Sequence, residues 1–174
     1  MRFTGRIVLI LLWGILSASS LLIGQISANI TCTDLSSFAP KDTLIKTTEN
    51  VETGTPHCKV AGVIEKEIKF ELLLPKEWNG RFMMGGGGAY VGSIQNQALA
   101  YGSGPGALER GYATVGTDTG HVSSYVDGSW ALNNLERQEN FGHRAVHLTA
   151  VTAKSIIKRY YARAPEYSYF VGCS

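Results

Sequence analysis

The last eight residues, Tyr167 to Ser174, most constrain the fold and the function of this chain. An aromatic and β-branched stretch leads directly into Gly172-Cys173-Ser174, which matches three positions of the pattern Gly-x-Ser-x-Gly. The pattern predicts a buried strand that delivers a serine to a sharp strand-to-helix turn, known as a nucleophile elbow. A serine hydroxyl is a weak nucleophile, so it needs a base and an oxyanion site nearby. An ordinary strand end is the competing interpretation.

Composition indicates one globular domain. Of the 174 residues, 44% are hydrophobic and 17% are charged, which is typical of a folded chain rather than a disordered one. The net charge is only +2, and no cluster of Lys and Arg with interleaved aromatic residues stands out. We therefore expect no nucleic-acid partner.

The N-terminus has the pattern of a signal peptide, which we expect to span residues 1–28. Arg2 and Arg6 precede an apolar run, and small residues near Ser19 or Ala28 offer cleavage sites. An uncleaved membrane anchor is the alternative, although the run is short and is broken by Gly14. We expect residues 29–174 to form the mature domain, secreted or periplasmic, without stable membrane association after cleavage.

Export changes the interpretation of the three cysteines. In an oxidising compartment Cys32 and Cys58 are expected to form a disulfide. Cys173 then remains, either as a small buried core residue or as half of a bridge whose partner lies elsewhere.

The middle of the chain predicts strands that lead into a glycine loop. Alternation from Ile68 to Leu74 predicts a strand that pairs as a hairpin with the apolar run Val60 to Ile64, and Arg81 to Met84 predicts another strand. Gly85 to Gly88 follow without the spacing of a phosphate-binding loop. Such a loop can supply a backbone N–H to an oxyanion hole, and a flexible turn is the alternative.

A second polar strand end follows the predicted strand Gly111 to Thr117. Asp118 and His121 lie upstream of the serine, whereas the acid and the histidine of a nucleophile-elbow enzyme follow it, so we exclude them from the catalytic triad. We expect a hydrogen-bonded pair that forms the floor of the site, in preference to a general base or a metal site, for which a third ligand is not evident.

The second half predicts one long helix, from about Glu139 to Ala162, and then a strand from Tyr167. His143 and His147 share a helix face but lack the glutamate of a zinc-protease motif, so we expect packing or surface roles and no metal site. The order of elements predicts an α/β fold with a mostly parallel sheet and flanking helices.

Five separated motifs, in this order, resemble the tannase and feruloyl esterase family over about Cys32 to Ser174. They are Trp78-Asn79-Gly80-Arg81-Phe82, the glycine run to Gly88, Gly111-Tyr112-Ala113 with Thr117-Asp118-Thr119-Gly120-His121, Phe141-Gly142-His143-Arg144-Ala145-Val146-His147, and Tyr169-Phe170-Val171-Gly172-Cys173-Ser174.

The resemblance implies an α/β-hydrolase core in which Ser174 is the nucleophile. It implies an oxyanion hole from a glycine of the run, Gly86 or Gly87, together with the N–H of the residue after Ser174. It also implies that Cys173 pairs with a cysteine next to the catalytic histidine, and that Cys32–Cys58 is the N-terminal bridge of the family.

The family's lid, its structural calcium and the catalytic Asp and His would all lie beyond Ser174. We therefore expect an N-terminal fragment, truncated before the lid and the later strands, which holds no cofactor and is inactive alone.

The sequence predicts a secreted serine esterase of small aromatic esters, such as hydroxycinnamoyl or galloyl esters. A secreted carbohydrate- or aromatic-binding module, in which Ser174 has no catalytic role, is the alternative. A phosphate-binding α/β domain is disfavoured by the glycine spacing.

Overall fold

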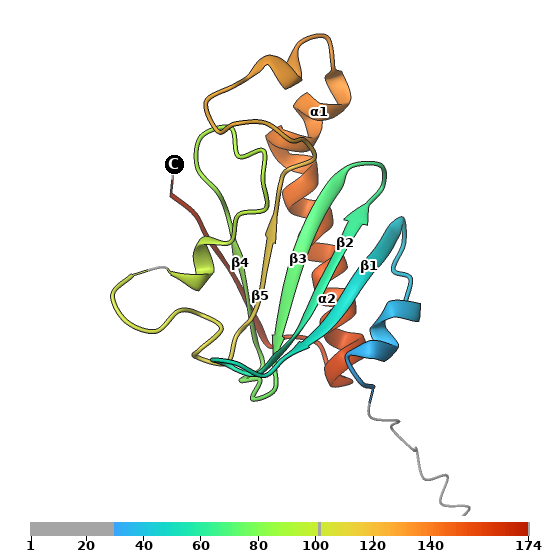
Figure 1. Cartoon of the computed structure of the whole chain (residues 1–174), viewed down its shortest axis with the longest axis vertical. Helices are drawn as coiled ribbons and strands as arrows, with labels where there is room; N and C mark the ends of the chain where they lie inside the picture. Colours follow the sequence, from blue (N-terminus) through green and yellow to red (C-terminus); the bar gives the residue numbers. More distant parts are fainter. Residues whose placement is uncertain (1–29, 101, 174) are drawn as a thin grey trace, which may run out of the picture.

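A computed structural model describes residues 30–100 and 102–173 of the chain. The predicted signal peptide and Ser174 lie outside the described residues. Six strands form one sheet, and one long helix packs against it (Figure 1). The strands are β1 (Thr43–Val51), β2 (His57–Ile64), β3 (Ile68–Pro75), β4 (Arg81–Gly85), β5 (Ala113–Thr117) and β6 (Tyr167–Val171). The helices are α1 (Leu135–Glu139) and α2 (Ala145–Tyr161), joined by one π-helical turn, η4 (Asn140–Arg144).

The sheet is mixed, with the strand order β1-β2-β3-β5-β4-β6. The pairs β1–β2, β2–β3 and β3–β5 are antiparallel, whereas the pairs β5–β4 and β4–β6 are parallel. The expectation of a mostly parallel sheet is therefore wrong for the described part of the chain. Short connections join the first three strands, and a short connection can only form an antiparallel pair.

The sequence pattern does not predict β1, although it is the longest strand. Only Ile45 is buried along its length, and the register shifts between Ile45 and Thr47. An edge strand with so little buried surface shows no apolar alternation. The other predicted strands are confirmed, including the β2–β3 hairpin, although β2 begins at His57, three residues before the predicted run. The expectation that the last strand is buried is wrong for the described residues, because β6 lies at the edge of the sheet and Tyr167 to Phe170 are exposed.

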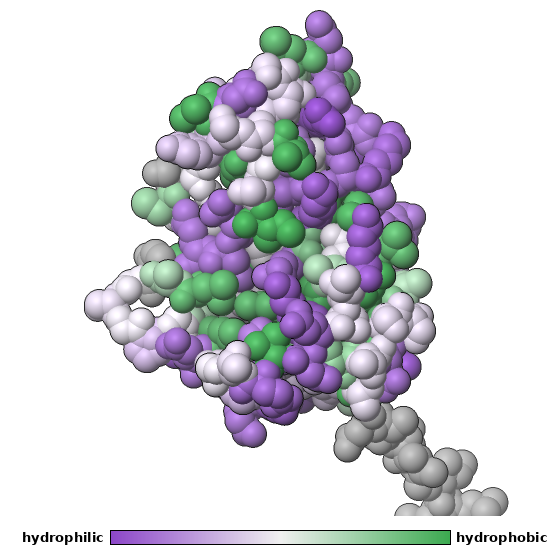
Figure 2. All heavy atoms as spheres, in the orientation of Figure 1, coloured by the Kyte–Doolittle hydropathy of each residue, from purple (hydrophilic) through white to green (hydrophobic). Residues whose placement is uncertain are grey.

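The core lies between the sheet and α2, which runs behind the strands in Figure 1. The helix buries Thr152, Ile156 and Ile157, whereas Val151 is 53% exposed. His143 and His147 are exposed, which confirms the surface interpretation of that pair. Figure 2 shows the opposite side of the sheet, where apolar patches lie among polar side chains.

A disulfide and an aromatic stack stabilise the fold. Cys32 and Cys58 form the expected disulfide, with Cα atoms 5.6 Å apart, and both residues are buried. Trp78 stacks on Tyr161 near the end of α2 with ring centroids 4.1 Å apart, and its indole N–H donates to the Arg81 carbonyl at 2.8 Å. The Trp78 motif therefore has a structural role, joining the turn before β4 to the helix.

Candidate active site

The candidate site lies where β4 and β6 end side by side. The two strands are parallel, with Gly85 opposite Val171, so both chains leave the sheet at the same edge. β4 continues into the glycine run, and β6 continues into Gly172 and Cys173. A Cβ atom added to Gly86 would lie only 3.5 Å from the Gly172 Cα. The fold thus brings together the two segments that the sequence analysis assigned to the oxyanion hole and to the nucleophile.

The two candidate oxyanion donors differ in their hydrogen bonds. The Gly86 N–H donates to the Val171 carbonyl at 2.7 Å and so extends the β4–β6 ladder beyond the strand. Among the described residues, no hydrogen bond takes up the Gly87 N–H. Gly87 is therefore the better placed of the two to donate to a reacting carbonyl oxygen.

The glycine run also allows another segment to approach the strand end. A Cβ atom on Gly85 would lie 2.5 Å from the Gln97 backbone nitrogen and even closer to the Asn96 side chain. No real Cβ atom tolerates such contacts, so only glycine lets the short 3₁₀ helix η2 (Gln97–Leu99) cross here.

Cys173 is exposed and forms no disulfide within the described part of the chain. The interpretation of Cys173 as a buried core residue is therefore wrong. A bridge to a cysteine beyond this chain stays a prediction.

Asp118 is buried at the end of β5 and joins two strands. Its Oδ1 accepts hydrogen bonds from the N–H groups of Lys69 and Gly120, both at 2.9 Å. Its Oδ2 has no hydrogen-bond partner, and the Lys69 ammonium lies 3.9 Å away. Burial raises the pKa of the Asp118 carboxyl above its ordinary value.

His121 is buried against the glycine-rich loop. Its ring stacks on Trp130, with centroids 3.7 Å apart, and its Nε2–H donates to the Tyr90 carbonyl at 2.7 Å. Burial lowers the pKa of His121, so the ring is neutral at physiological pH. The expected hydrogen bond between Asp118 and His121 is not present: Asp118 bonds to the backbone, and His121 bonds to the Tyr90 carbonyl and lies 3.5 Å from the Thr119 hydroxyl. Both side chains hold the chain around the strand ends.

Among residues 30–100 and 102–173, no group of three or more His, Cys, Asp or Glu side chains is arranged to hold a metal ion. No helix in these two ranges is both long and apolar enough to cross a membrane.

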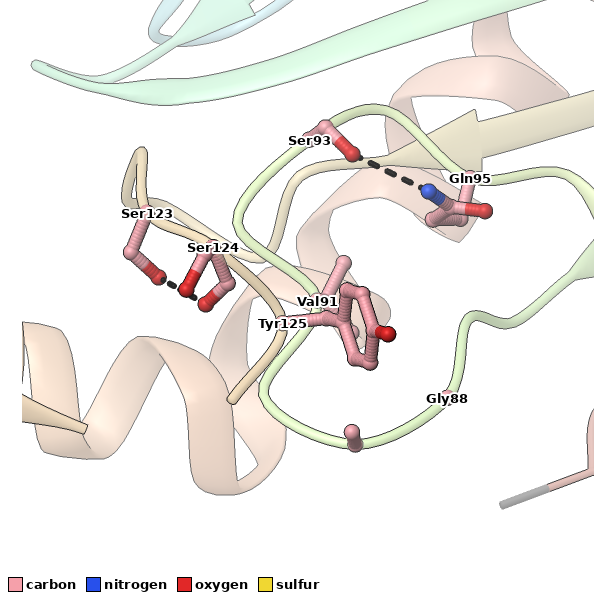
Figure 3. Close-up of a pocket in the computed structure, with 8 residues that line it drawn as sticks. Gly88, Val91, Ser93, Gln95, Ser123, Ser124 and Tyr125 are labelled. Carbon is pink, nitrogen blue, oxygen red and sulfur yellow. Dashed lines mark hydrogen bonds between the residues drawn. The ribbon is translucent and has the colours of Figure 1, made fainter. Parts of the chain in front are cut away.

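A cavity of about 470 Å³ adjoins the glycine run (Figure 3). Its walls come from the loop after β4 and from the segment after His121, and they carry several hydroxyl groups. The lining residues are Gly88, Ala89, Val91, Ser93, Gln95, Ser123, Ser124 and Tyr125. Ser93 accepts a hydrogen bond from the Gln95 amide at 3.0 Å, whereas the Tyr125 side chain is 66% exposed. The cavity can therefore offer both hydrogen-bonding groups and an aromatic ring to a small ligand.

Known proteins match this chain over most of its length. A family model described as "Tannase and feruloyl esterase" matches residues 52–174. An uncharacterized esterase of Xanthomonas campestris is 32% identical over 91% of this chain and 30% of its own length. The mono(2-hydroxyethyl) terephthalate hydrolase of Piscinibacter sakaiensis is 36% identical over 68% of this chain and 22% of its own length.

The similarity extends to solved structures. The crystal structure of feruloyl esterase B from Aspergillus oryzae superposes on 82% of this chain with a TM-score of 0.71 and 26% identity. The matched part is 32% of that esterase. The chain thus spans less than a third of the length of these relatives.

Proposed function

Because the chain belongs to the tannase and feruloyl esterase family, we propose that it is the N-terminal part of a secreted serine carboxylic-ester hydrolase. Ser174 is the proposed nucleophile. The observation that carries the proposal is the position of the glycine run directly beside the Gly172-Cys173 end of β6. An acyl-transfer site needs its nucleophile and its oxyanion donors at one place, and these two segments supply them.

In the proposed reaction, the Ser174 hydroxyl attacks the ester carbonyl and its proton passes to a histidine. The carbonyl oxygen becomes an oxyanion, which accepts hydrogen bonds from the Gly87 N–H and from the N–H of the residue after Ser174. Collapse of this intermediate breaks the ester bond, the alcohol leaves with the proton, and water hydrolyses the acyl-enzyme. The histidine and its aspartate belong to the proposed longer protein, beyond Ser174.

Several groups of this chain hold the site in place. Gly86 fixes the loop to β6 through Val171, and His121 fixes the same loop through the Tyr90 carbonyl. Preorganised donors of this kind require no rearrangement at the moment of reaction. We propose that the structural calcium of the family lies in the lid of the longer protein, and we assign no residue of this chain to it.

We propose aromatic esters as the substrates. The names of the relatives, terephthalate hydrolase and feruloyl esterase, support this class. The cavity beside the glycine run supports it too, because its hydroxyl groups and Tyr125 suit a ring that carries polar substituents (Figure 3). The Cys32–Cys58 disulfide is the feature that supports a secreted or periplasmic location.

The test is covalent labelling of the full-length protein with an aromatic phosphonate, which reacts with activated serines. The expected result is one label on Ser174 and its loss in Ser174→Ala, together with loss of aromatic ester hydrolysis. Ser168→Ala is the matched control, because Ser168 is an exposed serine of β6, only six positions before Ser174 in the sequence. Labelling that persists in Ser174→Ala would refute the assignment. An unlabelled protein that binds aromatic ligands would support a binding module instead.

A further inference from the structure

The side chain of Gln97 forms two hydrogen bonds with the backbone of Cys173. The Cys173 N–H donates to Gln97 Oε1 at 2.7 Å, and Gln97 Nε2 donates to the Cys173 carbonyl at 3.0 Å. A backbone N–H can only donate, so it fixes which end of the amide faces it. The amide therefore pairs with Cys173 as a neighbouring strand would, just past the end of β6.

The backbone of Gln97 is tied to the glycine run. Its N–H donates to the Gly86 carbonyl at 3.3 Å, and the Gly86 N–H donates to the Val171 carbonyl at 2.7 Å. These two backbone hydrogen bonds and the two hydrogen bonds of the Gln97 side chain form a closed ring through Gly86, Gln97, Cys173 and Val171. One residue thus contacts both the proposed oxyanion loop and the residue that precedes the proposed nucleophile.

Gln97 is itself held firmly from both sides. The neighbouring Ala98 is 1% exposed, and the Asn96 side chain donates to the Thr114 hydroxyl on β5 at 3.2 Å. Gly85 leaves the space that this segment needs. Both sequence neighbours of Gln97 are therefore anchored to the body of the domain, and the half-buried Gln97 side chain bonds to Cys173 from this anchored segment.

We propose that Gln97 is a positioning residue, which sets the place of Ser174 relative to the Gly87 N–H; this inference rests on the proposed esterase function. Cys173 is the residue bonded to Ser174, so loss of its two hydrogen bonds frees the serine backbone. A displacement of about 1 Å between reacting groups reduces rates by about 100-fold. Gln97 touches neither the substrate nor the reacting atoms in this role, so its loss lowers kcat while KM stays nearly constant.

The test compares two variants of the full-length protein with a matched control. Gln97→Ala removes both hydrogen bonds, and Gln97→Glu keeps the acceptor for the Cys173 N–H but loses the donor. Gln138→Ala is the control, because the Gln138 amide on α1 also donates to a backbone carbonyl, that of Ala131, at 2.7 Å. Hydrolysis of an aromatic nitrophenyl ester gives kcat and KM, and an aromatic phosphonate gives the labelling rate of Ser174.

We expect Gln97→Ala to lower kcat and the labelling rate by about 10- to 100-fold, with KM within about twofold and Gln138→Ala unchanged. A protonated glutamate regains a donor, so the activity of Gln97→Glu relative to wild type should rise as pH approaches the ordinary glutamate pKa of about 4.3. A purely structural role of Gln97 would not produce this rise. Unchanged kcat and labelling in Gln97→Ala would overturn the proposal.

Hydrogen exchange separates this inference from the proposed function. The Cys173 amide should exchange slowly in wild type and faster in Gln97→Ala, whether or not the protein is an esterase. A protein that protects this amide but takes no label refutes the esterase function, whereas a labelled protein with the same exchange in both forms refutes the role of Gln97.

Discussion

Removal of the Cys32–Cys58 disulfide should destabilise the protein by a predictable amount. The bridge joins residues 26 positions apart, linking the N-terminal 3₁₀ turn η1 (Thr33–Ser37) to β2. In the chain-entropy model, a loop of this length confines the unfolded chain by about 12 cal/mol/K, which is about 3.5 kcal/mol at 25 °C. Both cysteines are buried, so removal of their sulfur atoms also removes packing contacts, and this loss adds to the destabilisation.

The assay is urea unfolding of the Cys32→Ala/Cys58→Ala double variant against wild type, both without reductant. We expect the free energy of unfolding to fall by about 3–4 kcal/mol and the denaturant slope to rise, because the unfolded chain without the bridge exposes more surface. Ser168→Ala is the control, since this exposed serine of β6 should change stability by less than about 0.5 kcal/mol. A loss below about 1 kcal/mol in the double variant would refute the chain-entropy reasoning.

Three further outcomes test the site. Burial lowers the pKa of His121, so the stability that this residue contributes should fall as pH drops below its ordinary 6.5, and unfolding of His121→Gln should lack this fall. Burial raises the pKa of Asp118 above 3.8, so the contribution of Asp118 to stability is largest in acid and is lost as pH rises through its folded-state pKa. Asp118→Asn should therefore lower the free energy of unfolding, relative to wild type, by more in acid than at neutral pH. Gly85→Ala should cost about 1–3 kcal/mol in thermal or urea unfolding, whereas Gly142→Ala, where a Cβ meets nothing within 4 Å, should not destabilise the protein.

Local patterns predicted most of the elements of this fold. Alternation between Ile68 and Leu74 and the helical spacing toward Ile156 are properties of neighbouring residues, so they can be read from the sequence. The antiparallel pairing of β3 with β5 joins segments more than 40 residues apart, and nothing local specifies its direction. The mixed sheet was therefore beyond the reach of sequence patterns.

The same limit applies to the site. The Gly-x-Ser ending and the glycine run indicated the oxyanion loop and the nucleophile. The role of Gln97 depends on a contact across 76 positions and on space left by Gly85, so no motif marks it. The sequence also cannot distinguish the two candidate donors, Gly86 and Gly87. Only the structure shows that the Gly86 N–H already donates a hydrogen bond to the Val171 carbonyl.

The division of the sheet into an antiparallel and a parallel part implies an order of folding. β1 pairs with β2 and β2 with β3, which are sequence neighbours, and the disulfide joins residues only 26 positions apart. The pairing of β4 with β6 joins segments more than 80 residues apart in the chain. Contacts between distant segments form slowly because a long loop must close first. The proposed catalytic edge is therefore assembled last, on a part of the sheet that is already folded.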